Sequence, residues 1–162
     1  MSTAAFPDAW GFSLFCDDVR SEIAGKTTLV GLYQTDMIFT NDPPYLIPKF
    51  VIYIKYYERQ KTMSDDLVFG VYLPGDEQGK PTHSSKLPRQ SVPSDLPEPE
   101  IPFDEDQERV INLTVPLVFS PLVLQKEGFI KVRALCGDTT IKLGSLLVRK
   151  VKKDEKIPGL NA

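Results

Sequence analysis

Four aspartates in the first third of the chain, Asp17, Asp18, Asp36 and Asp42, have the residue type and spacing that best suit a chemical role. Loop carboxylates at one end of a β-sheet protein can supply the roughly six to eight oxygen ligands that Ca²⁺ takes. Adjacent residues of a strand point to opposite faces, so Asp17 and Asp18 cannot both face one site. We favour the alternative that one of this pair caps a turn or forms an ion pair with Arg20. EF-hand spacing is absent, and we expect neither a metal ion nor a cofactor.

Nucleophilic catalysis and zinc binding have less support. A catalytic histidine must be held rigidly against its partners, but the single histidine, His83, lies in a stretch flanked by proline and glycine. We therefore expect an exposed loop residue. Cys16 and Cys136 are separated by most of the chain, whereas zinc sites use short spacings, and we expect both to be buried, reduced thiols. The sequence also lacks a glycine-rich phosphate-binding loop. We predict that the protein is not an enzyme.

A group of aromatic residues, Phe50, Tyr53, Tyr56 and Tyr57, suggests a binding surface. Tyrosines on the outer face of an antiparallel sheet can bind a partner, but they also pack against neighbouring strands. Both interpretations stay open. The candidates for binding residues are Tyr53, Tyr57, Asp17 and Asp18.

Composition narrows the class of protein. The chain has 162 residues, which suits one domain, and a formal net charge of -3, which lacks the basic footprint of a nucleic-acid-binding protein. The first ten residues have no basic region followed by an apolar core, so we see no signal peptide. No apolar run is long enough for a membrane helix. We expect a cytoplasmic protein.

Short apolar runs with two-residue alternation, broken by Gly, Pro, Asp and Asn, predict strands throughout the chain. A helical period is nowhere sustained. The predicted strands cover residues 11–19, 27–33, 36–39, 49–57, 66–73, 109–119, 129–136 and 139–151, with a short edge strand near 82–87.

Several finer features follow from the strand pattern. Trp10, Phe12, Leu14 and Cys16 share one parity and should face the core. Residues 27–33 are apolar on both parities, which is typical of a central strand, and residues 49–57 and 66–73 should form a hairpin. Pro116 indicates an edge strand or a bulge. Gly137-Asp138 should turn a hairpin, and a slip in parity predicts a bulge at Gly144-Ser145.

The fold class that these elements predict is all-β: a seven- to eight-stranded antiparallel β-sandwich of immunoglobulin-like architecture. The alternative is a small β-barrel. We assign residues 1–151 to one domain and residues 152–162 to a polar, frayed C-terminal tail. Residues 88–106 are rich in proline, and residues 95–108 contain seven acidic residues and no basic one. We expect a long surface loop there. Basic residues cluster instead near the C-terminus.

The opening of the chain contains Phe15-Cys16-Asp17-Asp18-Val19-Arg20, then Gly25-Lys26, and then Leu29-Val30-Gly31 with Tyr33. These motifs resemble a bacterial family of uncharacterised small β-sandwich proteins, whose members begin with an F-C-D-D-[VI]-R element, followed by a G-K turn and an L-[IV]-G-x-Y strand. Ser120-Pro121-Leu122 and Gly128 resemble the family's C-terminal half. The resemblance covers most of the chain except the acidic loop. It implies a β-sandwich and brings no activity, cofactor or catalytic residue.

The function that we predict is a non-enzymatic binding or scaffold domain whose partner is a protein; a homo-oligomer is among the assemblies that the sequence allows. One alternative is a calcium-dependent or membrane-surface module similar to a C2 domain. The other is a hydrolase that uses carboxylates alone, although nothing in the sequence selects a pair.

The acidic loop gives a first testable prediction. Replacing residues 88–105 with a short linker should leave the fold intact, because long loops contribute little closure entropy and this one has few apolar anchors. Thermal unfolding of the deletion variant measures this. A melting temperature lower by more than about ten degrees would show that the loop packs as core.

Overall fold

The computed structural model describes residues 8–59, 66–88 and 109–155, and twelve strands lie within these ranges. A 3₁₀ turn at Ile23–Gly25 is the helical element of this part of the chain, and no helix in it is long and apolar enough to span a membrane. The strands are β1 (Ala9–Cys16), β2 (Asp18–Ser21), β3 (Thr27–Val30), β4 (Asp36–Phe39), β5 (Tyr45–Ile47), β6 (Phe50–Arg59), β7 (Asp66–Tyr72), β8 (His83–Pro88), β9 (Val110–Phe119), β10 (Leu122–Leu124), β11 (Gly128–Cys136) and β12 (Thr139–Lys150).

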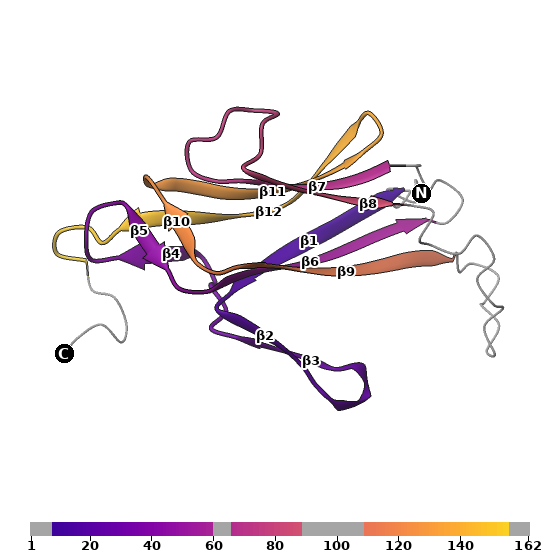
Figure 1. Ribbon diagram of the computed structural model, residues 1–162, viewed down its shortest axis with the longest axis horizontal. Coiled ribbons are helices and arrows are strands. Elements are labelled where there is room, and N and C mark those ends of the chain that lie inside the picture. The colour runs from indigo at the N-terminus through magenta and orange to yellow at the C-terminus, as the bar shows by residue number, and fades with distance from the viewer. Residues whose placement is uncertain (1–7, 60–65, 89–108, 156–162) are drawn as a thin grey trace, which may run out of the picture.

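Two sheets face each other as layers (Figure 1). One has the strand order β4-β12-β11-β7-β8 and the other the order β1-β6-β9. Strand β4 pairs with β12 in parallel, while the other pairs are antiparallel. Two ribbons, β5-β10 and β2-β3, complete the described strands. The all-β prediction is confirmed. The strand count was too low, the sheets are not purely antiparallel, and the described strands do not close a barrel.

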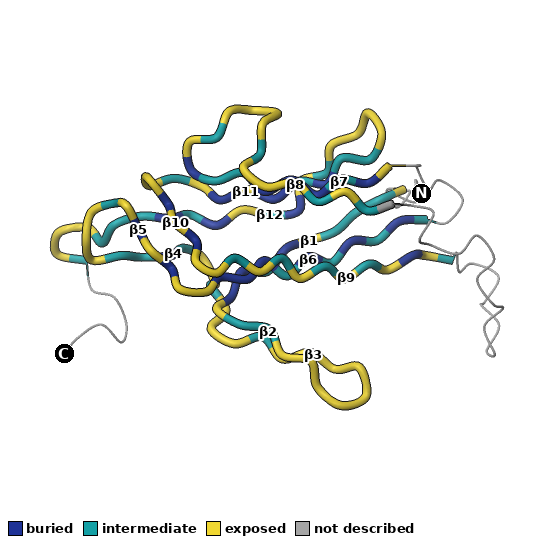
Figure 2. The backbone as a smooth tube through the Cα atoms, viewed as in Figure 1, coloured by how far each residue is buried: buried dark blue, intermediate teal, exposed yellow. Residues whose placement is uncertain are grey.

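The core lies between the two layers, where the buried stretches of the chain meet (Figure 2). Alternation works as predicted in the long strands: Ile52 and Ile54 of β6, Phe69 of β7 and Ile130 of β11 are buried. Each of these side chains faces the opposite sheet because residues two apart share a face. Strand β9 lies at the edge of its sheet among the described strands, which is one of the two possibilities that Pro116 indicated.

Strand β1 departs from the predicted parity. Phe12 is 43% exposed, whereas Ser13 and Phe15 on the other parity are buried. The physical reason is close approach: β1 runs against β12, and a Cβ atom on Gly11 would lie 2.9 Å from Leu143. Only small residues fit on this part of β1, so its inward face is less apolar than its outward face. The prediction from parity that Trp10, Phe12 and Leu14 face the core is therefore wrong. Cys16, which shares their parity, is buried.

The contact between β1 and β12 depends on a bulge. Val132 pairs with Gly144 and Arg133 pairs with Lys142, which leaves Leu143 without a partner in the ladder. The hydroxyl of Ser13 donates a hydrogen bond of 3.2 Å to the Leu143 carbonyl. This confirms a bulge next to the predicted position, and the hairpin turn at Gly137-Asp138 is also present.

One predicted hairpin and one predicted central strand were wrong. Strands β6 and β7 lie in different sheets and form no hairpin. Residues 27–33 are not a central strand: β3 ends at Val30 because Gly31 adopts a φ of +66°, and Leu32 is 46% exposed. The β2-β3 ribbon projects from the three-stranded layer (Figure 1). Apolar residues on both parities reflect a ribbon followed by a turn, not burial on two faces.

The predicted tail is held in place at its start. Glu155 accepts two hydrogen bonds from the Arg149 guanidinium, at 2.6 and 2.7 Å, and Arg149 also donates to Asp36 at 2.6 Å. The hydrogen bonds from Arg149 lower the pKa of Glu155 to about 2. Residues 152–155 are thus not frayed. The remaining tail residues and most of the acidic loop, residues 89–108, lie outside the described residues.

The tight contact at Gly11 gives a prediction about stability. Gly11→Ala should lower the free energy of unfolding by about 2 kcal/mol, because the new Cβ would lie 2.5 Å from the Lys55 carbonyl oxygen and the backbone must move. Gly70→Ala is the matched control, since its Cβ would make ordinary contacts at 3.4 Å or more. Urea unfolding of both variants measures the difference. Equal stability of the two variants would contradict the close approach.

Candidate functional site

The residues of the opening motif meet at a corner where β1 passes into β2. The hydroxyl of Tyr33 donates a hydrogen bond of 2.7 Å to Oδ1 of Asp17. The Asp17 amide donates to the Val30 carbonyl at 3.0 Å, and the Tyr33 amide donates to the Phe15 carbonyl at 2.9 Å. A Cβ atom on Gly31 would overlap the Asp17 carboxylate, so only glycine fits there. Hydrogen bonds therefore join the first part of the motif, residues 15–17, to its last part, residues 30–33.

Burial and hydrogen bonds shift the pKa values of Tyr33 and Asp18 at this corner. Burial and the hydrogen bond to Asp17 raise the pKa of Tyr33 well above its usual range, so its hydroxyl stays a neutral donor. Asp18 forms an ion pair with Lys49 at 2.5 Å and with Arg20 at 3.5 Å. The hydrogen bond from Lys49 lowers the pKa of Asp18. The predicted pair with Arg20 is therefore present, but Lys49 is the nearer cation.

The other two predicted aspartates have partners of their own. Asp36 is paired with Arg149, and Asp42 with Lys150 at 2.7 Å. Hydrogen bonds from Thr35 and Arg149 lower the pKa of Asp36. Across residues 8–59, 66–88 and 109–155, no three His, Cys, Asp or Glu residues form a group that could hold a metal ion. The structure does not bring the four aspartates together.

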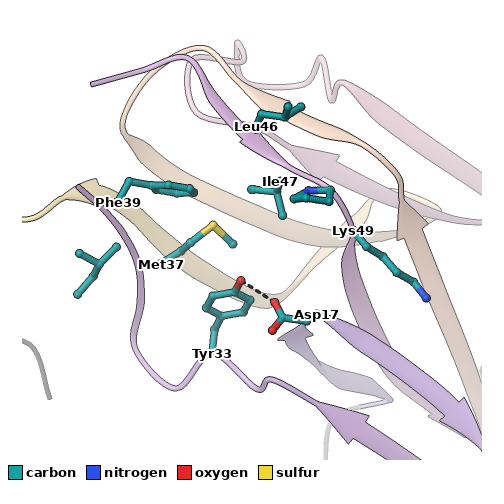
Figure 3. A pocket seen from close by; sticks show the side chains of 9 residues that line it. Asp17, Tyr33, Met37, Phe39, Leu46, Ile47 and Lys49 are labelled. Atoms are coloured by element: carbon teal, nitrogen blue, oxygen red, sulfur yellow. Dashed lines mark hydrogen bonds between the residues drawn. The ribbon is translucent and has the colours of Figure 1, made fainter. Parts of the chain in front are cut away.

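A groove of about 410 Å³ opens beside the motif corner (Figure 3). Its floor is apolar and buried, since Met37 is 3% and Ile47 is 6% exposed. Leu46 stands on its rim with 65% of its surface exposed. Figure 3 shows Phe39 at one end of the groove, and Asp17 and Lys49 at the other. The groove thus combines apolar walls with a polar mouth, which is typical of ligand-binding sites.

The groove lies between two strands that each have an unpaired edge. Strand β4 pairs only with β12, and β5 only with β10, among the described strands. The Phe39 carbonyl accepts from the Val151 amide at 2.8 Å, so Phe39 directs its backbone groups towards β12. Because successive residues of a strand direct these groups to opposite sides, the amide and carbonyl of Ile38 face the unpaired edge.

Tyr53 and Tyr57 lie on the outer face of the three-stranded sheet. Tyr57 stacks on Trp10 of β1, with ring centroids 5.6 Å apart. Tyr53 lies opposite Leu14 on one neighbouring strand and Pro116 on the other. Cross-strand packing, one of the two interpretations of these tyrosines, is therefore present at Tyr57. Phe50 and Tyr56 are fully buried and belong to the core, not to this face.

The histidine and the cysteines occupy ordered positions. His83 begins β8, opposite Val71, and its ring lies edge-on to Phe119 with centroids 5.5 Å apart. It is exposed as predicted but belongs to a strand, not a loop. Both cysteines are free thiols, with Cys16 buried and Cys136 half-buried. Burial raises the pKa of Cys16.

One buried polar group was missed from the sequence. Glu58 is 1% exposed, and its carboxylate accepts hydrogen bonds from Tyr56 at 3.3 Å and from the Cys136 thiol at 3.4 Å. Glu58 continues the inward parity of Ile52 and Ile54 along β6. The alternation that identified the core therefore also carried the signal for a buried carboxylate.

Comparison of the chain with protein-family models, with curated protein sequences and with solved structures finds no match. The family resemblance of the opening motif stays a prediction.

The contact between Gly31 and Asp17 gives a prediction that a double-mutant cycle tests. Gly31→Ala should lower the free energy of unfolding by about 2 kcal/mol, because alanine at positive φ is strained and its Cβ meets the Asp17 carboxylate. Asp17→Ala removes that carboxylate and the Tyr33 hydrogen bond, at a cost of about 1 kcal/mol. The double variant should lose less than the sum, as measured by urea unfolding. Additive losses would show that the two residues do not interact.

Proposed function

We propose that this chain is a protein-binding domain without enzymatic activity, and that it binds an extended peptide segment of its partner in the groove beside Asp17. The observation that carries the proposal is the groove itself, which joins apolar walls, an unpaired strand edge and an exposed carboxylate. Each of these features selects a different part of a peptide.

The apolar walls supply the first part of recognition. Leu46 on the rim lies opposite Val123 of β10, and the two are 65% and 41% exposed. Exposed apolar side chains next to a concave apolar floor are a feature of interaction sites. An apolar side chain of the partner would contact Met37 and Ile47 there and remove the rim from water. Burying one such side chain contributes about 2 kcal/mol.

The unpaired edge of β4 supplies the second part. An exposed strand edge is a template for another extended chain, because its amide and carbonyl groups lack a ladder partner. Peptides recognised by strand addition gain affinity from main-chain hydrogen bonds and specificity from side-chain pockets. The amide and carbonyl of Ile38 would form the first of these bonds, next to the apolar floor.

Charge supplies the third part. Lys49 is paired with Asp18, while Asp17 forms no ion pair with any described residue and accepts a hydrogen bond from the neutral Tyr33. At the mouth of the groove, the lysine is thus already paired with Asp18, and the Asp17 carboxylate has no ion-pair partner among the described residues. A partner peptide with a lysine or arginine beside its apolar anchor complements this arrangement.

We infer an immunoglobulin-like β-sandwich from the two facing, largely antiparallel sheets. The calcium-binding and hydrolase alternatives gain no support from the described residues, in which the candidate aspartates have separate partners.

Selection of a displayed library of random dodecapeptides on the immobilised protein tests the proposal. The enriched peptides should share an apolar residue next to a lysine or arginine. Leu46→Asp should weaken binding of an enriched peptide by about tenfold or more, since it places a charge on the apolar rim. Asp17→Asn keeps the acceptor for Tyr33 and should weaken binding about fivefold. Fluorescence anisotropy measures both affinities.

Two control variants make the test specific. Val118→Asp adds the same charge at an exposed apolar residue of β9, and Asp138→Asn removes an exposed carboxylate in the β11-β12 turn. Both should bind the peptide as the parent protein does. Amide exchange at Ile38 should slow when the peptide binds. Failure to enrich any peptide, or equal affinity of the Leu46→Asp and Val118→Asp variants, would sink the proposal.

A further inference from the structure

A second groove lies on the outer face of the five-stranded sheet, away from the apolar groove. Its volume is about 720 Å³. The connection between β7 and β8 forms one wall, and the outward side chains of β11 and β12 form the floor. This connection stands above the sheet (Figure 1), and most of its residues are exposed (Figure 2).

Three basic side chains line this groove: Lys131, Arg133 and Lys142. Arg133 lies directly opposite Lys142 in the ladder, and Lys131 lies two residues away on the same face of β11. None of the three forms an ion pair with a described residue. Like charges placed directly opposite each other destabilise a sheet. The folded chain therefore maintains an unfavourable positive cluster that an anion would relieve.

The one acidic side chain of the lining does not neutralise this cluster. Asp76 accepts hydrogen bonds from the Leu73 amide at 2.9 Å and from the amide and hydroxyl of Thr82 at 2.8 and 2.7 Å. These bonds hold the two ends of the β7-β8 connection together. The carboxylate of Asp76 thus shapes the wall of the groove.

Arg133 is positioned in advance for a ligand. Its Nη1 donates to the Val132 carbonyl at 2.8 Å and to the Gly144 carbonyl at 3.4 Å, beside the bulge. Two backbone carbonyls hold one nitrogen of the guanidinium, and its other nitrogens stay available. A fixed guanidinium loses less conformational entropy when it binds a carboxylate.

We propose that this groove binds an acidic peptide segment of a partner protein in an extended conformation, with carboxylates at alternate positions. Lys131 and Arg133 share a face two residues apart, which places them about 6.6 Å apart along β11. Carboxylates two residues apart in an extended peptide have the same repeat. The half-buried Tyr72 and the 48% exposed Phe129 would contact the peptide between its charges.

A peptide fits this groove better than a nucleic acid does. The chain has a net charge of -3, and nucleic-acid affinity depends on many phosphate contacts made by a basic surface. Three cations beside two aromatic side chains match a short segment of mixed acidic and apolar residues.

The test uses a fluorescein-labelled peptide in which glutamate alternates with leucine and serine, titrated with the full chain. Fluorescence anisotropy should show binding that weakens as salt rises. Arg133→Gln and Lys142→Gln should each weaken it about fivefold. Lys153→Gln, which removes an exposed lysine elsewhere, should leave it unchanged. Lys142→Gln should also unfold at the same or a higher temperature, because it relieves the repulsion opposite Arg133.

Two further probes distinguish the outcomes. A peptide of the same composition with its glutamates in one block should bind more weakly, and a labelled thymidine oligonucleotide should bind more weakly still. If Lys153→Gln weakened binding as much as Arg133→Gln and Lys142→Gln do, net charge alone would explain the binding and the proposal would be overturned. The same would follow if the peptide with its glutamates in one block bound as tightly as the alternating peptide. Tighter binding of the oligonucleotide through Arg133 and Lys142 would replace the peptide with a nucleic acid. No binding of the alternating peptide at millimolar concentration would reject the site. Because Leu46 and Asp17 do not line this groove, none of these outcomes tests the proposal for the apolar groove.

Discussion

The close contact between β1 and β12 is the constraint on which the arrangement of the two layers depends. Gly11 and Gly144 remove the side chains that would separate the strands, and the bulge at Leu143 presents a carbonyl that Ser13 satisfies. A buried carbonyl without a donor would cost roughly 1–3 kcal/mol, so the bulge and the serine belong together. This contact brings the three-stranded sheet against the five-stranded sheet along one side, and the apolar faces of β6, β7 and β11 fill the space between them.

Much of the fold could be predicted where the alternation of apolar residues within a single strand indicates which of its faces is buried. Alternation in β6, β7 and β11 identified the buried residues because these strands have one face against a continuous core. The same rule failed in β1, where close packing selects Gly11 and Ser13 over large apolar residues. It also failed beyond β3, where the positive φ of Gly31 ends the strand and leaves Leu32 in solvent. That β6 and β7 join different sheets could not be inferred, because proximity in sequence does not determine which sheet a strand joins.

The candidate site could likewise be predicted from the sequence only in part. Asp17 and Asp18 were identifiable as residues, and an ion pair between one of them and Arg20 was among the predicted alternatives. The groove beside them was not, because it depends on where β4 and β5 lie, and these short strands meet the motif corner only in the folded chain. Lys131, Arg133 and Lys142 likewise appear as ordinary outward lysines and arginines in the sequence. Only the ladder register places Arg133 opposite Lys142 and reveals an uncompensated cluster.

The parallel pairing of β4 with β12 also has a consequence for how the chain reaches its native state. Asp36 and the arginine that holds it are 113 positions apart, and β12 is the last strand of the described chain. During synthesis β4 must wait until Arg149 of β12, 113 positions further along the chain, has left the ribosome before its ladder can form. Proteins rich in such distant contacts have a high contact order and fold slowly. The nascent chain therefore exposes an apolar strand for longer than a protein of local hairpins does, and molecular chaperones recognise this kind of surface.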